Sequence, residues 1–323
     1  MAFTSGTIAG GTAAANHTAL LVAIHDFCTT GLGASNWIDI KWQELVGSSP
    51  DAPYNQRQWM FIAPGLSGTE QIFGGIRTRT AGTYANFELA GYFGNFGSDP
   101  SWNTDFVNQP LAKFAFVTLW ADPIDYWIIA NGQRCIVVCR VGTVWTAFHI
   151  GKILPYASPS EAPYPFFLAG TNNDVTAQIS DTAGHRTFQC GARGSQYIFL
   201  NTNDWSEVGM WNNGNDTSVN AAESYVIQTA INWFGSSNPY ATFTGSKANP
   251  DGTVNLIPLE IVTTRSPGAT LGQIEGAYWC SGLDQNGSVI PSGSIITISS
   301  VQYLIIPNIF RINSYDFMAV RLS

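Results

Sequence analysis

The sequence predicts a mainly β fold, with β-sandwich-like antiparallel sheets and one N-terminal helix. The 323 residues include 32 Gly, 19 Phe, 12 Tyr and 11 Trp, and aromatic residues favour strands while glycines mark turns. Apolar residues occur in short runs that turn-forming residues separate, which is typical of strands. Charged residues make up only 11% of the chain, against roughly 25% in ordinary soluble domains. A surface so poor in charge suits either burial in an assembly or a Gly- and Asn-rich extracellular β protein.

Residues 12–27 are expected to form the helix. Alanines follow Thr12, whose hydroxyl is suited to cap the first turn, and Gly31 and Gly33 would end the helix. Its apolar residues recur at helical spacing: Leu20, Leu21, Ile24 and Phe27.

Strands are then expected where short apolar runs alternate with polar residues. These segments are Trp37–Val46, Gln58–Ala63, residues 70–80 and Tyr84–Phe93. A polar stretch follows from Gly94 to Pro110.

A hairpin is predicted within residues 114–151. Asn131-Gly132 joins two apolar runs, and this dipeptide favours a two-residue type I′ loop because both loop residues need positive φ. Such a loop would set the pairs Ala130 with Gln133, Ile128 with Cys135, and Trp127 with Ile136. Both faces of the pair are largely apolar. The hairpin therefore belongs either between two layers of one domain or between a domain and a neighbouring subunit.

The amino-acid composition changes after Gly170. Residues 171–222 are rich in Asn, Asp, Thr and Gly, and Ala221–Phe234 fits a helix or a strand. Further strands are expected at Asn255–Thr264, at Gly272–Cys280, and as three strands near the C-terminus with turns at Ser299-Ser300 and Asn313-Ser314. We expect one part at residues 1–170 and a second at 171–323, packed on the first.

A proline-rich segment, residues 155–167, is a candidate strap across a neighbouring subunit. Prolines favour extended backbone and remove hydrogen-bond donors, so neither a helix nor a central strand is expected there. An ordered loop pinned by its aromatic residues is the compatible structural interpretation. The candidate interface residues are Pro155, Tyr156, Pro159, Pro163, Tyr164, Pro165 and Phe166.

Charge and cysteine content exclude several classes of function. The net charge of −8 and the lack of a basic cluster give no electrostatic reason to bind nucleic acid. No apolar run reaches the roughly 18–20 residues of a membrane helix, and no signal peptide is evident, so synthesis in a cytoplasm and no membrane insertion are expected. Cys135 and Cys139 would lie roughly 13 Å apart along one strand, beyond disulfide reach. Buried free thiols are the expectation for the five cysteines, and the odd count leaves an intermolecular disulfide as the alternative.

Catalytic and metal-binding patterns are weak. Ser67 lies in Gly65-Leu-Ser-Gly68, which misses the nucleophile elbow G-x-S-x-G by one position. The acids that a glycoside hydrolase would need from separate strands are Glu70, Glu88, Asp122 and Asp125. The histidines, none at metal-ligand spacing, are His17, His25, His149 and His185. We therefore expect no catalytic residue, no metal and no cofactor.

Tryptophans among Asn and Asp residues suggest a sugar-binding platform, because an indole face stacks on a pyranose while amides bind its hydroxyls. The candidates are Trp102, Trp205 and Trp211. A loop tryptophan that anchors its segment into the fold is the structural alternative.

Several sequence segments resemble those of virion structural proteins of tailed bacteriophages with contractile or long tails. They are PGLSGTEQIFGGIRT (64–78), ADPIDYWIIANGQRCIVVCRVGTVW (121–145), HIGKILPYASPSEAPYPFFLAG (149–170) and the ending YLIIPNIFRINSYDFMAVRL. The small polar leader before the helix and the order of these blocks are also similar. The resemblance is least clear between residues 171 and 255.

The resemblance implies a structural role in a tail-associated ring, as a neck, collar or baseplate component. The partners would be other copies of the chain and other tail proteins, and the location would be the virion. A carbohydrate-binding receptor-recognition protein of the phage tail is the alternative. A hydrolase acting on cell-wall or capsule sugars is a third hypothesis.

Overall fold

Antiparallel strands dominate the fold. The computed structural model describes residues 1–44, 57–81, 84–93, 106–107, 109–156, 165–171, 188, 196–200, 204–210, 224–226, 249, 254–263, 269–307 and 317–323. One α-helix accompanies the strands in this part of the chain, so the predicted mainly β fold is confirmed. The chain divides into two compact units, one formed by residues 1–152 with 159–207 and the other by 153–158 with 208–323.

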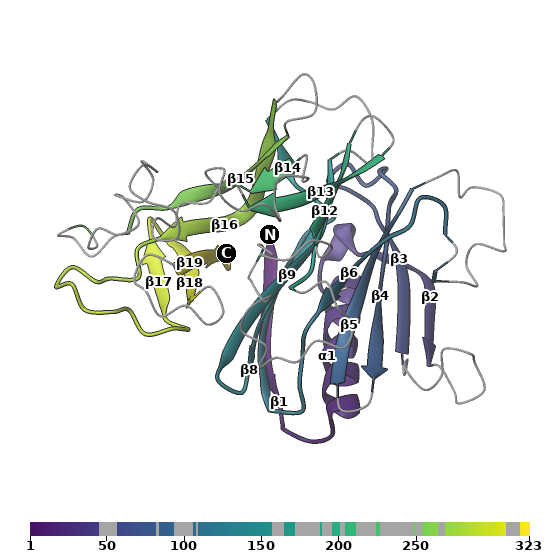
Figure 1. The fold of residues 1–323 in the computed structure, drawn as a ribbon, viewed down its shortest axis with the longest axis horizontal. Helices are drawn as coiled ribbons and strands as arrows, with labels where there is room; N and C mark the ends of the chain where they lie inside the picture. Colours follow the sequence, from purple (N-terminus) through teal and green to yellow (C-terminus); the bar gives the residue numbers. More distant parts are fainter. Residues whose placement is uncertain are drawn as a thin grey trace. The chain divides into compact units, whose positions relative to one another are not determined.

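The first unit contains two antiparallel sheets (Figure 1). The larger sheet has the order β1 (Ala2–Ile8), β7 (Ile124–Ala130), β8 (Arg134–Val141), β9 (Val144–Lys152), β11 (Phe166–Ala169), β12 (Gln196–Leu200) and β13 (Asp204–Met210). The smaller sheet has the order β2 (Ile38–Glu44), β3 (Arg57–Ala63), β4 (Ile72–Ala81), β5 (Tyr84–Tyr92) and β6 (Lys113–Val117).

Helix α1 (Ala13–Thr30) lies between the two sheets (Figure 1). It contacts β3, β4 and β5 of the smaller sheet and β1 and β7 of the larger one. The Thr12 hydroxyl accepts a hydrogen bond from the backbone N–H of Ala15 at 3.2 Å, and the Gly31 N–H donates to the Phe27 carbonyl at 2.8 Å. The predicted helix and both of its ends are confirmed, and a short 3-10 turn, η1 (Gly33–Ser35), follows.

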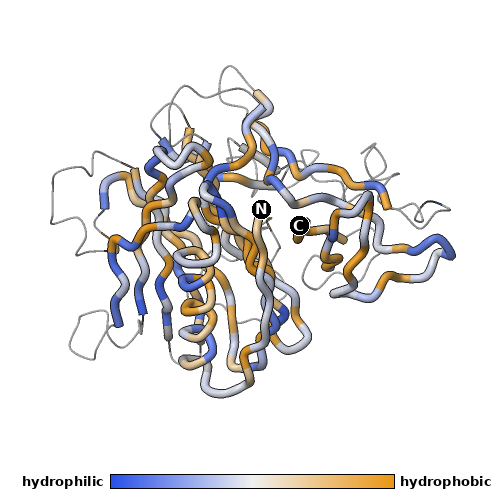
Figure 2. The backbone as a smooth tube through the Cα atoms, turned by 180° about the vertical axis from the view of Figure 1, so that it is seen from behind, coloured by the Kyte–Doolittle hydropathy of each residue, from blue (hydrophilic) through white to orange (hydrophobic). Residues whose placement is uncertain are grey.

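One hydrophobic core joins the helix to both sheets. Leu20 and Ile24 of α1 belong to it, together with Phe87 of β5 and Val137 of β8. Figure 2 shows hydrophobic residues along the strands and the helix, where they alternate with more hydrophilic residues. Two sheets that share a core in this way form a β-sandwich, with the helix filling space between the layers.

The N-terminal residues form a strand that no local pattern predicts. β1 pairs with β7 along its whole length, from Ala2 opposite Ala130 to Ile8 opposite Ile124. The residues Ala-Phe-Thr-Ser-Gly-Thr-Ile show no clean alternation, so only the long-range pairing makes this segment a strand. The expected polar leader is thus the edge strand of the larger sheet.

The predicted hairpin exists, but its register differs from the prediction by two residues. Ala130 pairs with Cys135, and Ile128 with Val137. Side chains alternate with a period of two, so this shift leaves every residue on its predicted face. The face with Ile128 and Val137 belongs to the core between the two sheets, as one of the two alternatives predicted. On the other face Ile129 and Ile136 are buried and Trp127 is half-buried.

Asn131 itself explains the longer loop. Its side-chain oxygen accepts hydrogen bonds from the N–H groups of Gln133 at 2.8 Å and Arg134 at 3.1 Å, which closes an Asx turn. Gly132 does not have positive φ, so the predicted type I′ turn is wrong. Positive φ at both loop residues occurs instead at Ser299 (50°) and Ser300 (69°).

The second unit contains the remaining strands. Their order is β14 (Ser224–Val226), β15 (Ile257–Thr263), β16 (Ala269–Cys280), β19 (Phe317–Arg321), β18 (Val301–Pro307) and β17 (Ile295–Ile298), and β10 (Leu154–Pro155) pairs with β16. A core that includes Cys280, Ile305 and Phe317 packs beneath them. The predicted turn at Ser299-Ser300 is confirmed, whereas Asn313-Ser314 lies outside the described residues.

Two boundaries differ from those expected. Phe166 begins β11, a central strand between β9 and β12, so the expectation that residues 155–167 contain no central strand is wrong at this end. A proline removes a hydrogen-bond donor only at its own position. The segment Phe166–Ala169 is apolar and contains no proline, so each of its residues can pair in a sheet. The second unit takes its main segment from Val208 onward, and not from residue 171.

Candidate functional site

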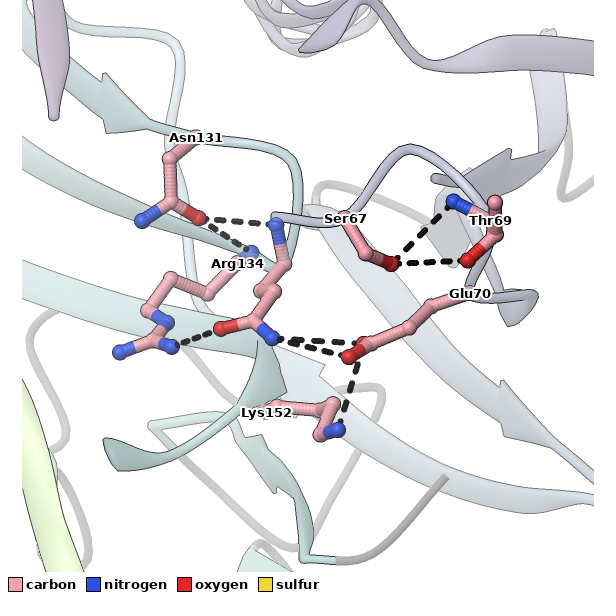
Figure 3. A network of polar contacts seen from close by, with 7 residues as sticks. Ser67, Thr69, Glu70, Asn131, Arg134 and Lys152 are labelled. Atoms are coloured by element: carbon pink, nitrogen blue, oxygen red, sulfur yellow. Dashed lines mark hydrogen bonds and ion pairs between the residues drawn. The ribbon is translucent and has the colours of Figure 1, made fainter. Parts of the chain in front are cut away.

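A polar cluster surrounds the tip of the β7–β8 hairpin. We call it the hairpin-tip cluster; it consists of Glu70, Asn131, Gln133, Arg134 and Lys152 (Figure 3). Glu70 comes from the loop between β3 and β4, and the other members come from the hairpin and the end of β9. Residues 64–70 and 131–152 thereby meet, although they are far apart in the sequence.

Glu70 is the centre of this cluster. Its carboxylate accepts hydrogen bonds from the Gln133 side-chain amide at 3.3 Å and forms an ion pair with the Lys152 ammonium group at 3.2 Å. The Lys152 side chain is only 7% exposed and that of Glu70 is 24% exposed. A nearly buried ammonium group needs a carboxylate partner, so the contact fixes the Glu70 loop on the hairpin.

Backbone contacts hold the same loop against the hairpin tip. The Gly65 N–H donates to the Gly132 carbonyl at 2.7 Å, and the Trp37 indole N–H donates to the Asn131 carbonyl at 2.8 Å. A Cβ atom on Gly132 would lie 2.1 Å from the Gly65 carbonyl oxygen. Glycine is therefore required at this position by close backbone approach, and not by positive φ.

Ser67 has a local structural environment. Its hydroxyl hydrogen-bonds with the Thr69 hydroxyl at 2.9 Å and accepts from the Thr69 N–H at 3.3 Å (Figure 3). A serine nucleophile needs a base within hydrogen-bond reach, and both partners of Ser67 belong to its own loop. The geometry fits an ST turn that shapes residues 64–70.

The acids that a glycoside hydrolase would need each contact a different partner and do not form one group. Glu88 on β5 is buried and pairs with Arg77 at 2.7 Å, while Asp125 on β7 pairs with Arg140 of the neighbouring strand. Asp122 accepts a hydrogen bond on its backbone carbonyl from the Asn16 side chain at 2.8 Å. Glu70, Glu88 and Asp125 thus each face a cation, which suits them to hold strands together.

His149 lies on the face of the larger sheet opposite the shared core. Its Nδ1 donates to the Phe167 carbonyl at 3.0 Å, because a carbonyl can only accept, and the ring is fully buried. The pKa of His149 is lowered from its ordinary 6.5 to about 3, mainly by burial; the hydrogen bond to the Phe167 carbonyl opposes this lowering and the nearby Arg134 guanidinium adds to it. The imidazole is therefore neutral at pH 7.

The candidate interface residues have different surroundings. Tyr156 is 51% exposed, its N–H donates to the Leu271 carbonyl at 3.1 Å, and its hydroxyl donates to Glu260. Pro155 pairs with Gly272 in the second unit, whereas Phe166 is fully buried in the core of the first unit and offers no surface to a partner. Pro165 is also buried, and Pro159, Pro163 and Tyr164 lie outside the described residues.

Among the candidate sugar platforms, only Trp205 falls within the described residues. Its ring packs against Phe93 and Phe199, with ring centres 5.1 and 5.2 Å apart, and its indole N–H donates to the Leu111 carbonyl at 2.7 Å. These contacts anchor Trp205 in the fold. Trp102 and Trp211 lie outside the described residues.

Two edge strands, β1 and β17, carry exposed apolar side chains, which the sequence did not predict. Phe3 on β1 is 39% exposed, and Ile295 on β17 is 51% exposed. β1 and β17 each end their row of paired strands. A local pattern identifies a strand but does not show that it lies at an edge, so this feature needed the topology.

The described part of the chain contains no cluster of three or more His, Cys, Asp or Glu residues that could hold a metal ion. No helix in that part is both long enough and apolar enough to cross a lipid bilayer. No protein family model matches the sequence. A comparison with curated proteins also found no significant match.

Proposed function

We propose that this chain is a structural subunit of a tailed-phage particle, in a tail-associated ring of the neck, collar or baseplate. Contacts with other copies and with other tail proteins hold it in place. The observation that carries the assembly role is the presence of two uncharged edge strands with exposed apolar side chains, β1 and β17.

Edge strands present unpaired N–H and C=O groups, and soluble proteins usually protect them with charge, proline or a β-bulge. β1 has no charged residue, no proline and an unbroken register with β7 from Ala2 to Ile8. β17 consists of Ile-Ile-Thr-Ile and pairs with β18 without a register shift. These two strands are suited to accept a strand or an apolar surface from a neighbouring subunit.

β2, an edge of the smaller sheet, also carries an exposed apolar residue, Ile38 at 57%, but its charged residues and its register shift protect its backbone edge. It contains Asp39, Lys41 and Glu44, and its register with β3 shifts between Asp39 and Lys41. The same chain thus carries the usual protection on one edge and lacks it on two others. This difference favours selective use of β1 and β17 in assembly.

The kind of assembly follows from the resemblance to tailed-phage virion proteins in residues 64–78, 121–145 and 149–170. All three segments contribute residues to the hairpin-tip cluster, whose contacts join the loop before β4 to the hairpin and to the end of β9. Ring subunits need rigid sheets, and they need contact surfaces with few charges. The low charge content of the chain agrees with this requirement.

Two measurements test the proposal. Mass spectrometry of purified phage particles, with immunogold electron microscopy, should find the chain at the tail or at its junction with the head. In sedimentation velocity the purified chain should self-associate, and Phe3→Lys should weaken that association at least tenfold. Val289→Lys is the matched control, because it places the same charge on an exposed apolar residue outside β1 and β17. A chain that stays monomeric and is absent from particles would overturn the proposal.

A further inference from the structure

Among the described residues, the rows of paired strands end at β1 and β17 and at β2 and β6. The edge of β6 already has a partner, because the Thr171 N–H donates to the Phe116 carbonyl at 2.7 Å and the Thr118 N–H donates to the Thr171 hydroxyl at 3.0 Å. β2 is protected by its charged residues and its register shift. The unprotected edges in the described part of the chain are therefore β1 and β17.

β1 and β17 have the same two-sided pattern. On β1 the exposed residues are Phe3, Ser5 and Thr7, and half-buried residues alternate with them. On β17 Ile295 and Thr297 are exposed, while the other two isoleucines pack on the core of the second unit. Neither strand carries a charge. Each strand thus presents one side to its own core and the other side, with apolar and hydroxyl side chains, to solvent.

Pairing β1 with β17 joins these two patterns without conflict. Residues that lie directly opposite each other in an antiparallel pair point to the same face of the sheet. One register places Ser5 opposite Ile295. Phe3 then lies opposite Thr297, so exposed residues meet exposed residues, and all four residues of β17 have a partner in β1. Phe3 and Ile295 become diagonal neighbours, and an aromatic and a β-branched side chain pack well in that arrangement.

Pairing of either edge with its own copy fits less well. A two-fold dimer requires an antiparallel pair of identical strands. Full-length pairing of β17 with itself would place the exposed Ile295 opposite Ile298, which packs on the core side. Full-length pairing of β1 with itself would place Phe3 opposite Thr7, so neither aromatic ring would gain an apolar partner. Each edge therefore complements the other edge better than it complements itself.

We propose that β17 of one copy adds to the free edge of β1 of the next copy, so that copies of this chain join head to tail. The inference rests on the proposed assembly role and names the partner of its two edge strands. Main-chain hydrogen bonds between the edges supply the affinity of such a strand addition. A head-to-tail contact uses two different surfaces of each copy, and it generates a ring when the rotation between neighbours closes.

A mixing experiment tests the direction of this contact. Phe3→Lys places a charge on β1 and leaves β17 intact, whereas Ile295→Lys does the reverse. In sedimentation velocity each variant alone should self-associate about tenfold more weakly than wild type, since an edge lysine opposes strand pairing. An equimolar mixture should form a dimer and nothing larger. Only the intact β17 of one variant and the intact β1 of the other can pair.

A second pair of variants guards against a substitution that prevents folding. Ser5→Lys and Thr297→Lys lie at exposed positions of the same strands and should behave in the same way. Mixtures of both pairs that stay monomeric, while wild type associates, overturn the inference.

The other outcomes also decide the question. Undiminished association of Ile295→Lys alone indicates that β1 pairs with itself, and undiminished association of Phe3→Lys alone indicates that β17 does; either result overturns the inference. A monomeric wild-type chain overturns it as well. The proposed function is judged separately, because finding the chain in purified phage particles supports that function even when head-to-tail pairing fails.

Discussion

Gly132→Ala should destabilise the first unit, because the hairpin tip and the loop before β4 approach each other through their backbones. The new Cβ would lie 2.1 Å from the Gly65 carbonyl oxygen and 2.9 Å from its carbonyl carbon. The nearest atoms belong to the Gly65 backbone and not to a flexible side chain, so the loop itself must shift by about 1.4 Å to restore ordinary contact distances of about 3.5 Å. That shift breaks the 2.7 Å hydrogen bond from Gly65 to Gly132.

The expected net loss of unfolding free energy is about 1–3.5 kcal/mol. Losing a backbone hydrogen bond costs about 1 kcal/mol, and leaving its donor without a partner costs about 1–3 kcal/mol more. Alanine has a smaller conformational entropy than glycine in the unfolded chain, which offsets about 0.4–1 kcal/mol of this loss. The offset applies because Gly132 does not have positive φ, so alanine can adopt its backbone conformation.

Urea unfolding followed by tryptophan fluorescence would measure this loss. Gly11→Ala is the matched control, because its nearest contact, the Asn16 side-chain oxygen, lies at an ordinary 3.4 Å. It should change the unfolding free energy by less than about 0.5 kcal/mol. Equal stability of the Gly132→Ala and Gly11→Ala variants would refute the close-approach reasoning.

Three further predictions concern buried charge, pH and the Pro-rich segment. Glu70→Gln should cost about 1–3 kcal/mol, because Lys152 loses its carboxylate partner, and a double-mutant cycle with Lys152→Met should give a coupling of about 1 kcal/mol; additive effects would exclude a direct pairing. His149 stays neutral in the folded protein down to about pH 3, whereas the unfolded chain binds a proton below its ordinary pKa of 6.5. Stability should therefore fall by up to about 1.4 kcal/mol per pH unit on acidification through this range, and urea titrations at pH 7 and pH 5 should show a smaller fall in His149→Gln. Phe166→Ala should cost about 3–5 kcal/mol and Tyr156→Ala less than about 0.5 kcal/mol, because only the first ring is fully buried; thermal melts that rank them the other way would contradict the burial.

The candidate assembly surfaces were harder to predict than the fold class. The composition of the Pro-rich segment predicted a contact with a neighbouring subunit, but Phe166 at its end is part of a central strand. Phe3 was not predicted as a contact residue, because a single aromatic residue among Thr, Ser and Gly forms no recognisable pattern. Whether such a residue is exposed at an edge depends on which strands pair with its own, and pairing partners are remote in the sequence.

The sequence by itself determined the mainly β class, the helix with its Thr12 cap, and the face on which each hairpin residue lies. These properties depend on local conformational preference and on the period of the side chains, which neighbouring residues already contain. The tertiary structure alone decided the hairpin register, the role of Gly132, the meeting of Glu70 with Lys152 and the pairing of β1 with β7. Those features arise where distant segments approach closely enough for backbone packing, buried charge and strand pairing to outweigh the preferences of a dipeptide such as Asn131-Gly132.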